Sequence, residues 1–298
     1  MDTYARLVAP HLGRHLGGTV VVKNVPMGGG TYALNSVYNI KKPDGLTIAT
    51  GDTGSLILGQ LFKDKAVKYD YKKFNWLGRI SWGKRVILVG KESSFQSFKD
   101  LMKQKVIKIA TNIFQASPAM TWTLLAHALD LAPSRLKVIT GYGGGKNIVM
   151  SAVQGESDSV GFTEDSAAKF AKGGLVRTVL TVDKEKSSYF PNVPTLYEEY
   201  KIPEERGWPL TTYLVLNKLR RFLIAPPGVP SERIAFLRRA VSECFRDKAF
   251  LAEAVKLKRP ILPLSGEEMQ EQINKKFGTL SDEQVKEFKY IAVEKYNQ

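Results

Sequence analysis

The sequence is poor in the residues that build covalent or metal-held sites. It contains one cysteine, Cys244, and three histidines, His11, His15 and His127. A single cysteine excludes an internal disulfide and every CxxC metal or redox motif. His11 and His15 lie four residues apart on a predicted helix, but no HExxH motif and no cluster of carboxylates accompanies them. Helix histidines without a metal are therefore the better interpretation, and we expect neither a metal nor a cofactor.

Catalytic and membrane-spanning signals are missing as well. The sequence has no GxSxG nucleophile elbow and no GxxxxGK[ST] phosphate loop. We can name no convergent acid, base or nucleophile set, so we predict that the chain is not an enzyme. No run of eighteen or more apolar residues is present, which predicts that the chain is not embedded in a membrane. Met1 runs directly into a polar, helix-like segment, so no secretory signal is recognisable.

The excess of positive charge allows two readings. Lys and Arg number 44 against 29 Asp and Glu, a formal net charge of +15. Nucleic-acid binding needs clustered basic residues, whereas a solvated basic surface attracts anions in general. The basic residues form short, scattered groups such as Lys41-Lys42, Arg220-Arg221 and Lys275-Lys276. There is no basic tail and no zinc-finger spacing, so we predict no nucleic-acid partner, and a small anionic ligand suits the charge equally well.

The pattern of apolar residues predicts an α/β fold. With 298 residues the chain is long enough for two lobes. The spacing of Val8, Leu12 and Leu16 predicts a helix over 4–16, and Thr19–Val22 is a β-branched run typical of a buried strand. Helix-like segments then alternate with short strands, which favours layered α/β lobes. Further strands are expected at 46–50, 86–89, 107–111, 138–139, 159–162, 175–181 and 222–225, and caps at Ser231 and Ser265.

Four junctions between a strand, a loop and a helix carry glycines or hydroxyl residues. They are Gly28–Thr31, Thr50–Ser55, Thr111–Ser117 and Tyr142–Lys146. Such junctions expose backbone N–H groups, and the following helix has a partial positive charge at its N-terminus. Several of these junctions pointing into one cleft would form a carboxylate or phosphate site without any catalytic group. Their convergence is a hypothesis at this stage.

These segments together resemble a known family of receptors. The block YDYKKFNWLGR resembles the family segment YDpxxFxwIG, and GYGGGKNIVMSAVQGESD is similar to YKGxxPALxxLLGGxVD. FPNVPTLYEEY resembles the PDVPTxxE box, and LIAPPGVPSERIAFLRRA the APxGTP turn and helix. DTYARLVAPHL, VVVKNVPMGGG and KPDGLTIAT precede them in the family's order. The chain thus resembles, over nearly its whole length, the extracytoplasmic solute receptors of the tripartite tricarboxylate transporter family, often called Bug receptors.

The resemblance implies a fold, a ligand and a partner. It implies a type II periplasmic-binding-protein fold, in which two α/β lobes enclose a ligand cleft. Lobe 1 would comprise 1–87 plus 222–298 and lobe 2 would comprise 88–221. It further implies a periplasmic, monomeric protein that closes on a small carboxylate and presents it to membrane permease subunits. The site residues implied by the family's loops are Thr53, Ser55, Thr111, Asn112, Ser117, Tyr142, Gly144 and Thr163.

Two departures from the family and two alternatives accompany this interpretation. The family carries a strand and a Gly-Gly loop just before the Asp that matches Asp2, and because this sequence lacks them we expect lobe 1 to lack its first strand. The Thr111 loop carries Ile113, Phe114 and Gln115 in place of glycines, which predicts a differently shaped pocket. The alternatives are a ligand sensor that feeds a signalling partner and, with less support, an enzyme on the same two-lobed fold.

Overall fold

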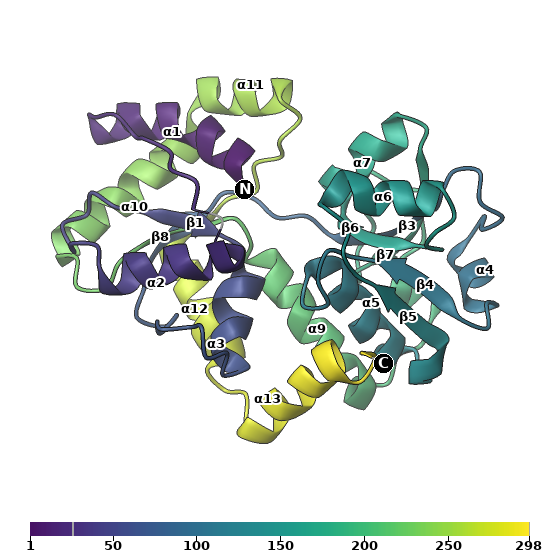
Figure 1. Cartoon of the computed structure of the whole chain (residues 1–298). Coiled ribbons are helices and arrows are strands. Elements are labelled where there is room, and N and C mark those ends of the chain that lie inside the picture. The colour runs from purple at the N-terminus through teal and green to yellow at the C-terminus, as the bar shows by residue number, and fades with distance from the viewer. Residues whose placement is uncertain (26, 298) are drawn as a thin grey trace. The chain divides into compact units, whose positions relative to one another are not determined.

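The chain folds into two compact units. The computed structural model describes residues 1–25 and 27–297, and for Gly29 and Ser55 it describes the backbone only. Unit 1 contains Met1–Trp82 and Leu216–Ser281, and unit 2 contains Gly83–Val215 and Asp282–Gln298 (Figure 1). The chain therefore passes between the units three times, and the segment after residue 281 belongs to unit 2. The division into lobes at 87/88 and 221/222 stays a prediction.

Unit 1 is built on an antiparallel sheet of four short strands. The strand order is β1 (Ala49–Gly51), β8 (Phe222–Ala225), β2 (Asn75–Arg79) and β9 (Leu264–Ser265). All four residues of β8 are buried, as expected for a central strand whose sequence is entirely apolar. The rings of Trp76 and Phe222 meet edge to face with 5.3 Å between their centroids. The sheet thus joins segments from the two ends of the chain.

The helices of unit 1 bury their apolar faces around this sheet. The helix α1 (Asp2–Leu16) packs against α10 (Ser231–Arg246) and α11 (Lys248–Lys256). Leu7 and Leu12 of α1 share one apolar cluster with Phe245 and Phe250. The remaining helical segments are η1 (Met27–Gly30), α2 (Thr31–Asn39), η2 (Gly54–Leu58), α3 (Gly59–Leu61) and α12 (Gly266–Phe277).

Unit 2 combines an antiparallel sheet with a parallel strand pair. The three-stranded sheet has the order β6 (Val160–Thr163), β3 (Arg85–Gly90) and β7 (Val176–Val182), and all its pairings are antiparallel. The strands β4 (Ile107–Ala110) and β5 (Leu136–Ile139) pair in parallel. A single parallel bridge from Ile109 to Ser159 links β4 to the start of β6. The strands β4, β5 and β6 therefore run in the same direction.

Helices of unit 2 cover these strands and include the end of the chain. The segment η4 (Tyr290–Glu294) packs against α5 (Ser117–Ala128), where the Thr123 hydroxyl donates to the Ala292 carbonyl at 3.0 Å. Nearby, the Tyr296 hydroxyl donates to the Leu131 carbonyl at 3.0 Å. The helix α9 (Glu204–Lys218) begins in unit 2 and ends in unit 1. The other helices are α4 (Phe98–Met102), η3 (Pro133–Arg135), α6 (Gly145–Val153), α7 (Glu164–Lys172), α8 (Leu196–Glu199) and α13 (Asp282–Lys289).

Most predicted elements are confirmed, and the mixed α/β class with them. The strand at Phe222–Ala225 has the predicted bounds, and a helix covers 2–16 where one was predicted over 4–16. Ser265 caps α12, because its hydroxyl accepts from the Glu268 N–H while the Glu268 carboxylate accepts from the Ser265 N–H. In the described residues no helix is both long and apolar enough to cross a membrane.

Two predicted features are wrong. The run Thr19–Val22 forms no strand, and Val21 is 72% exposed. β-branched residues favour extended backbone, but a strand also needs a neighbour for its N–H and C=O groups, and no described strand pairs with this run. Ser231 does not cap α10, because the helix already includes it and Pro230 occupies the cap position.

The helix α9 has no counterpart among the predicted elements. It contains Pro209, which removes one backbone donor and usually ends a helix. It nonetheless continues to Lys218 through residues 210–216, most of which are buried. Burial of this apolar stretch outweighs the local cost of the proline.

Candidate anion-binding site

Two of the predicted loops lie side by side in unit 2. Because β4 and β5 are parallel, the loops that follow them leave the same edge of the sheet. Backbone hydrogen bonds join these loops directly. The Gly141 N–H donates to the Asn112 carbonyl at 2.9 Å, and the Tyr142 N–H donates to the Thr111 carbonyl at 3.3 Å. The structure therefore brings the Thr111 and Tyr142 loops together.

The end of β6 faces this edge as well, next to the start of α5. A Cβ atom on Gly161 of β6 would lie 3.3 Å from the Thr121 Cβ and 3.4 Å from the Pro118 carbonyl oxygen. Such contacts are tighter than van der Waals packing normally allows, so glycine is the residue that fits here. The absence of a side chain at residue 161 lets the first turn of α5 approach the strand. Thr163, the last residue of β6, thus belongs to the same region of unit 2.

The start of α5 offers hydrogen-bond donors. The helix begins at Ser117 after Ala116, and no side chain caps its first turn. The first N–H groups of a helix have no acceptor within the helix, and its N-terminus carries partial positive charge. Ser117 is half-buried, and among the described residues its hydroxyl has no hydrogen-bond partner. This turn is therefore suited to an anion.

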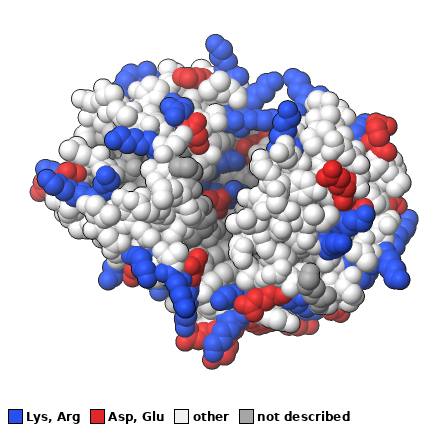
Figure 2. All heavy atoms as spheres, viewed as in Figure 1, with Lys and Arg blue, Asp and Glu red and all other residues white. Residues whose placement is uncertain are grey.

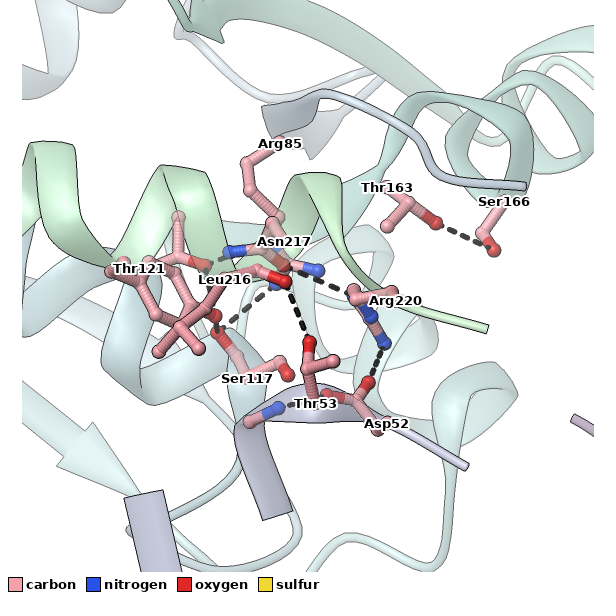
Figure 3. A network of polar contacts seen from close by, with 12 residues as sticks. Asp52, Thr53, Arg85, Ser117, Thr121, Thr163, Ser166, Leu216, Asn217 and Arg220 are labelled. Carbon is pink, nitrogen blue, oxygen red and sulfur yellow. Dashed lines mark hydrogen bonds and ion pairs between the residues drawn. The ribbon is translucent and has the colours of Figure 1, made fainter. Parts of the chain in front are cut away.

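A buried arginine braces the same turn, and sequence reasoning did not single it out. Arg85 is 3% exposed. Its Nε donates to the Thr121 hydroxyl at 2.9 Å, and its Nη2 donates to the Ser117 carbonyl at 3.0 Å (Figure 3). The same Nη2 donates to the Gly161 carbonyl at 3.2 Å. The guanidinium therefore adds positive charge beside the start of α5 and fixes its position against β6. The available signal was an arginine at the head of the apolar run RVILVG.

Thr111 and Asn112 differ in what they can offer a ligand. Thr111 is fully buried, and its hydroxyl donates to the Ile113 carbonyl at 3.1 Å. That hydroxyl hydrogen is therefore used within the loop and stabilises its shape. Asn112 is exposed, and its side-chain oxygen lies 3.4 Å from the Thr111 hydroxyl. Of the two, Asn112 has the more accessible donor.

Tyr142 and Gly144 form the second loop. The Tyr142 hydroxyl donates to Glu156 Oε2 at 2.8 Å, and burial together with this carboxylate raises the pKa of Tyr142. Gly144 has φ +101°, a backbone conformation that favours glycine, and it precedes the first residue of α6. Its own N–H donates to the Tyr142 carbonyl at 2.9 Å. The glycine thus lets the chain turn into α6 and expose that helix's first N–H groups.

Thr163 lies in a less favourable electrostatic environment. Its hydroxyl donates to the Ser166 hydroxyl at 3.1 Å (Figure 3). It is followed by Glu164 and Asp165 in the first turn of α7, and both are buried. Glu164 accepts from the Ser187 hydroxyl at 2.6 Å. Because two acidic residues occupy this turn, an anion is favoured less here than at α5.

Unit 1 contributes a differently built loop after β1. The Thr53 hydroxyl donates to the Leu216 carbonyl at 2.6 Å, and Asp52 forms an ion pair with Arg220 (Figure 3). Thr53 is fully buried, so its hydroxyl tethers the loop to the end of α9. The side chain of Ser55 lies outside the described residues. In this loop the predicted hydroxyl is thus engaged within the protein.

The predicted site residues therefore form two sets. Thr111, Asn112, Ser117, Tyr142, Gly144 and Thr163 belong to unit 2, and Thr53 belongs to the β1 loop of unit 1. Within residues 1–25 and 27–297, no group of three or more His, Cys, Asp or Glu side chains is arranged to hold a metal ion. The gathered groups are amide and hydroxyl donors and one guanidinium, which can bind and orient an anion. Their role as a ligand site stays a prediction.

Solved structures share this fold. The MatC protein of Rhodopseudomonas palustris, solved with bound malate, is 20% identical with a TM-score of 0.67, and the match covers 95% of this chain and 94% of that one. A second R. palustris protein, solved with adipate, is 16% identical with a TM-score of 0.72, covering 98% and 92%. These likenesses confirm the predicted periplasmic-binding-protein fold.

Sequence comparisons identify the family. A UPF0065 protein of Bordetella bronchiseptica is 24% identical over 273 residues, which cover 91% of this chain and 74% of that protein. The family model of the tripartite tricarboxylate transporter family receptor matches residues 4–258. The family is one of binding proteins, which confirms the prediction that this chain is not an enzyme. The chain belongs to the tripartite tricarboxylate transporter receptor family.

Proposed function

We propose that this protein is an extracytoplasmic receptor that captures a small carboxylate and presents it to membrane permease subunits. The observation that carries the proposal is the start of α5 in unit 2. There the helix N-terminus, the Ser117 hydroxyl and the guanidinium of Arg85 lie next to the loops after β4 and β5. A carboxylate accepts such donors with short, charge-assisted hydrogen bonds, and they stabilise it further when water is excluded.

The chemistry of two structural neighbours supports the ligand class. Malate and adipate, present in those structures, are both dicarboxylates, and adipate is the longer of the two. Ile113 of this chain is 57% exposed, so the loop before α5 presents an apolar side chain as well as polar groups. A carboxylate with an apolar chain suits this combination, because the loop buries methylene groups while α5 holds the carboxylate.

Charge and family support the location and the partner. The net charge of +15 raises the local concentration of anions near the surface. Figure 2 shows Lys and Arg at many places on the visible face, with Asp and Glu among them, so the charge is distributed. Receptors of this family belong to transporters, which supports a periplasmic location and delivery to a permease. We propose that the receptor acts as a monomer.

Thermal-shift and calorimetric titrations test the ligand class. Mono-, di- and tricarboxylates, including malate and adipate, are compared with their methyl esters, which lack the charge. A ligand at about a hundredfold its Kd should stabilise the folded chain by about 2.7 kcal/mol. We expect the free acids to stabilise the chain and the esters to leave it unchanged. A cooperatively melting protein that no carboxylate stabilises would contradict the proposal.

A pair of serine variants tests the site. Ser117→Ala removes the hydroxyl at the start of α5, and we expect it to weaken carboxylate binding by about tenfold or more, the usual value of a hydrogen bond to a charged group. Ser94→Ala is the matched control, because Ser94 is an exposed turn residue of unit 2. Equal affinities of the two variants would exclude Ser117 from the site.

Transport distinguishes delivery from sensing. Membrane vesicles that contain the permease subunits should take up the bound carboxylate only when the receptor is added. Binding without any stimulation of uptake would favour the sensor interpretation instead.

A further inference from the structure

Arginines gather beside the first turn of α1 in unit 1. The guanidinium carbons of Arg221 and Arg259 lie 4.5 Å and 5.7 Å from the centre of the Tyr4 ring. Tyr4 is buried, and its hydroxyl accepts from Arg221 Nη1 at 3.1 Å and donates to the Pro260 carbonyl at 3.2 Å. One anchored ring thus holds two guanidinium groups in fixed positions.

The two guanidinium groups lie close to one another, because both contact the same buried ring. Like charges that approach one another in a partly buried place repel. The arrangement therefore favours an anion beside Tyr4.

The neighbouring acids of unit 1 are engaged elsewhere. Asp52 forms an ion pair with Arg220. Asp2 accepts hydrogen bonds from Arg6 at 3.0 Å and from Asn24 at 2.7 Å. Neither carboxylate neutralises Arg259. Among the described residues, Arg259 forms no ion pair with any acid.

Arg259 also has an unsatisfied donor. Its side chain is half-buried, and its Nε is buried without a hydrogen-bond partner among the described residues. Burying a guanidinium N–H without an acceptor costs free energy, and native proteins rarely leave one in that state. An oxyanion would satisfy this donor and reduce the repulsion between the guanidinium groups. Arginine is suited to this task because its planar fork matches two oxygens of one anion.

We propose that Arg221 and Arg259 form an oxyanion subsite beside Tyr4 in unit 1. The ligand group is a carboxylate, phosphate or sulfate carried by a small molecule, since these share the required pair of oxygens. Arg259 binds it directly, whereas Arg221 contributes charge and is held by Tyr4. The proposal needs only residues of unit 1, and it stands independently of carboxylate capture at α5.

Arginine Nε–H signals in NMR spectra test this subsite directly. The full chain is titrated with inorganic phosphate and, separately, with acetate. We expect the Arg259 Nε–H signal to shift with saturation by at least one of them. Saturation by phosphate alone identifies a phosphoryl ligand, and saturation by acetate identifies a carboxylate. A signal that neither anion moves would overturn the proposal. Phosphate is not a carboxylate, so the outcome of the phosphate titration at Arg259 does not depend on whether α5 binds a carboxylate.

Three variants separate a built subsite from general charge attraction. Arg259→Gln should weaken binding of the effective anion by about tenfold or more. Arg259→Lys keeps the positive charge but lacks the planar guanidinium, so it should lose less affinity for the anion than Arg259→Gln does. Arg246→Gln is the matched control, because Arg246 is exposed at the end of α10 in the same unit. If Arg246→Gln weakens binding as much as Arg259→Gln, the anion responds to net charge alone and the subsite does not exist.

Discussion

The polar loops of the two units are built on different physical principles. In unit 2 the loops after the parallel strands β4 and β5 leave one edge together, so backbone N–H groups and hydroxyls gather there with a single guanidinium. In unit 1 the sheet is antiparallel, and its β1 loop is tethered by Thr53 and by the Asp52–Arg220 pair. In unit 2 the parallel direction of the strands brings the donor loops together and Arg85 braces them, whereas the β1 loop of unit 1 is held by side-chain contacts.

The largest loss of stability is expected when Arg85, the buried arginine of unit 2, is replaced. Arg85→Met should lower the free energy of unfolding by about 3 kcal/mol or more, because three hydrogen bonds from the buried guanidinium, to Thr121, Ser117 and Gly161, are lost. Urea denaturation measures the change. Arg177→Met is the matched control, since Arg177 is half-buried and donates a side-chain hydrogen bond to the Phe95 carbonyl at 2.9 Å. If both variants lose the same free energy of unfolding, Arg85 does not stabilise unit 2 more than an ordinary half-buried arginine does.

A smaller change in stability is expected from Cys244 of unit 1 at alkaline pH. Burial and, less strongly, Asp247 raise the pKa of the Cys244 thiol from its ordinary 9.0 to about 12. Between these values the unfolded chain loses a proton that the folded chain keeps, so stability falls as pH rises above 9.0. The slope approaches about 1.4 kcal/mol per pH unit for one group.

Removing the thiol isolates this contribution. Cys244→Ala lacks the group that titrates, so its stability should fall less steeply with pH. Relative to about pH 8, the wild-type advantage over the variant should shrink by about 1 kcal/mol at about pH 10. Urea denaturation at both pH values provides the comparison. Parallel pH profiles would show that the thiol remains accessible to solvent in the folded chain.

The smallest effect is expected at the tether of unit 1. Arg220→Gln removes an ion pair whose side chains are 19% and 23% exposed, together with the 3.3 Å bond from Arg220 to Asn217. Solvent screens a pair of this exposure, so we expect a loss of about 1 kcal/mol. The measurement is again urea denaturation. A loss as large as that of Arg85→Met would contradict the contrast between the two units.

Regular elements could be read from sequence because local patterns determine them. The apolar run Phe222–Ala225 and the capping pair Ser265 and Glu268 behave as their chemistry predicts. The run Thr19–Val22 fails because a strand is a property of two segments, and the sequence of one does not reveal its partner. Periodicity predicted single elements only. The family resemblance predicted the periplasmic-binding-protein fold in which these elements are arranged.

The candidate site was predictable only in part. The junction before α5 carries visible signals, a hydroxyl residue and the start of a helix. Arg85 carries only a weak signal, its place at the head of the apolar run RVILVG, and an arginine ahead of an apolar strand is more often a solvated end. Its contacts to Thr121 and Gly161 join residues 36 and 76 positions away, which no local pattern encodes. Likewise, only the fold places Arg259 beside Tyr4.

Backbone NMR of the full chain during titration tests the central claim most directly. The titrant is the carboxylate that gives the largest thermal shift, with its methyl ester as the control. Capture at α5 predicts that the largest amide shifts fall in residues 111–117 and 141–146, and that the ester produces none of them. Shifts confined to other parts of the chain, or no shift with any carboxylate, would contradict the account.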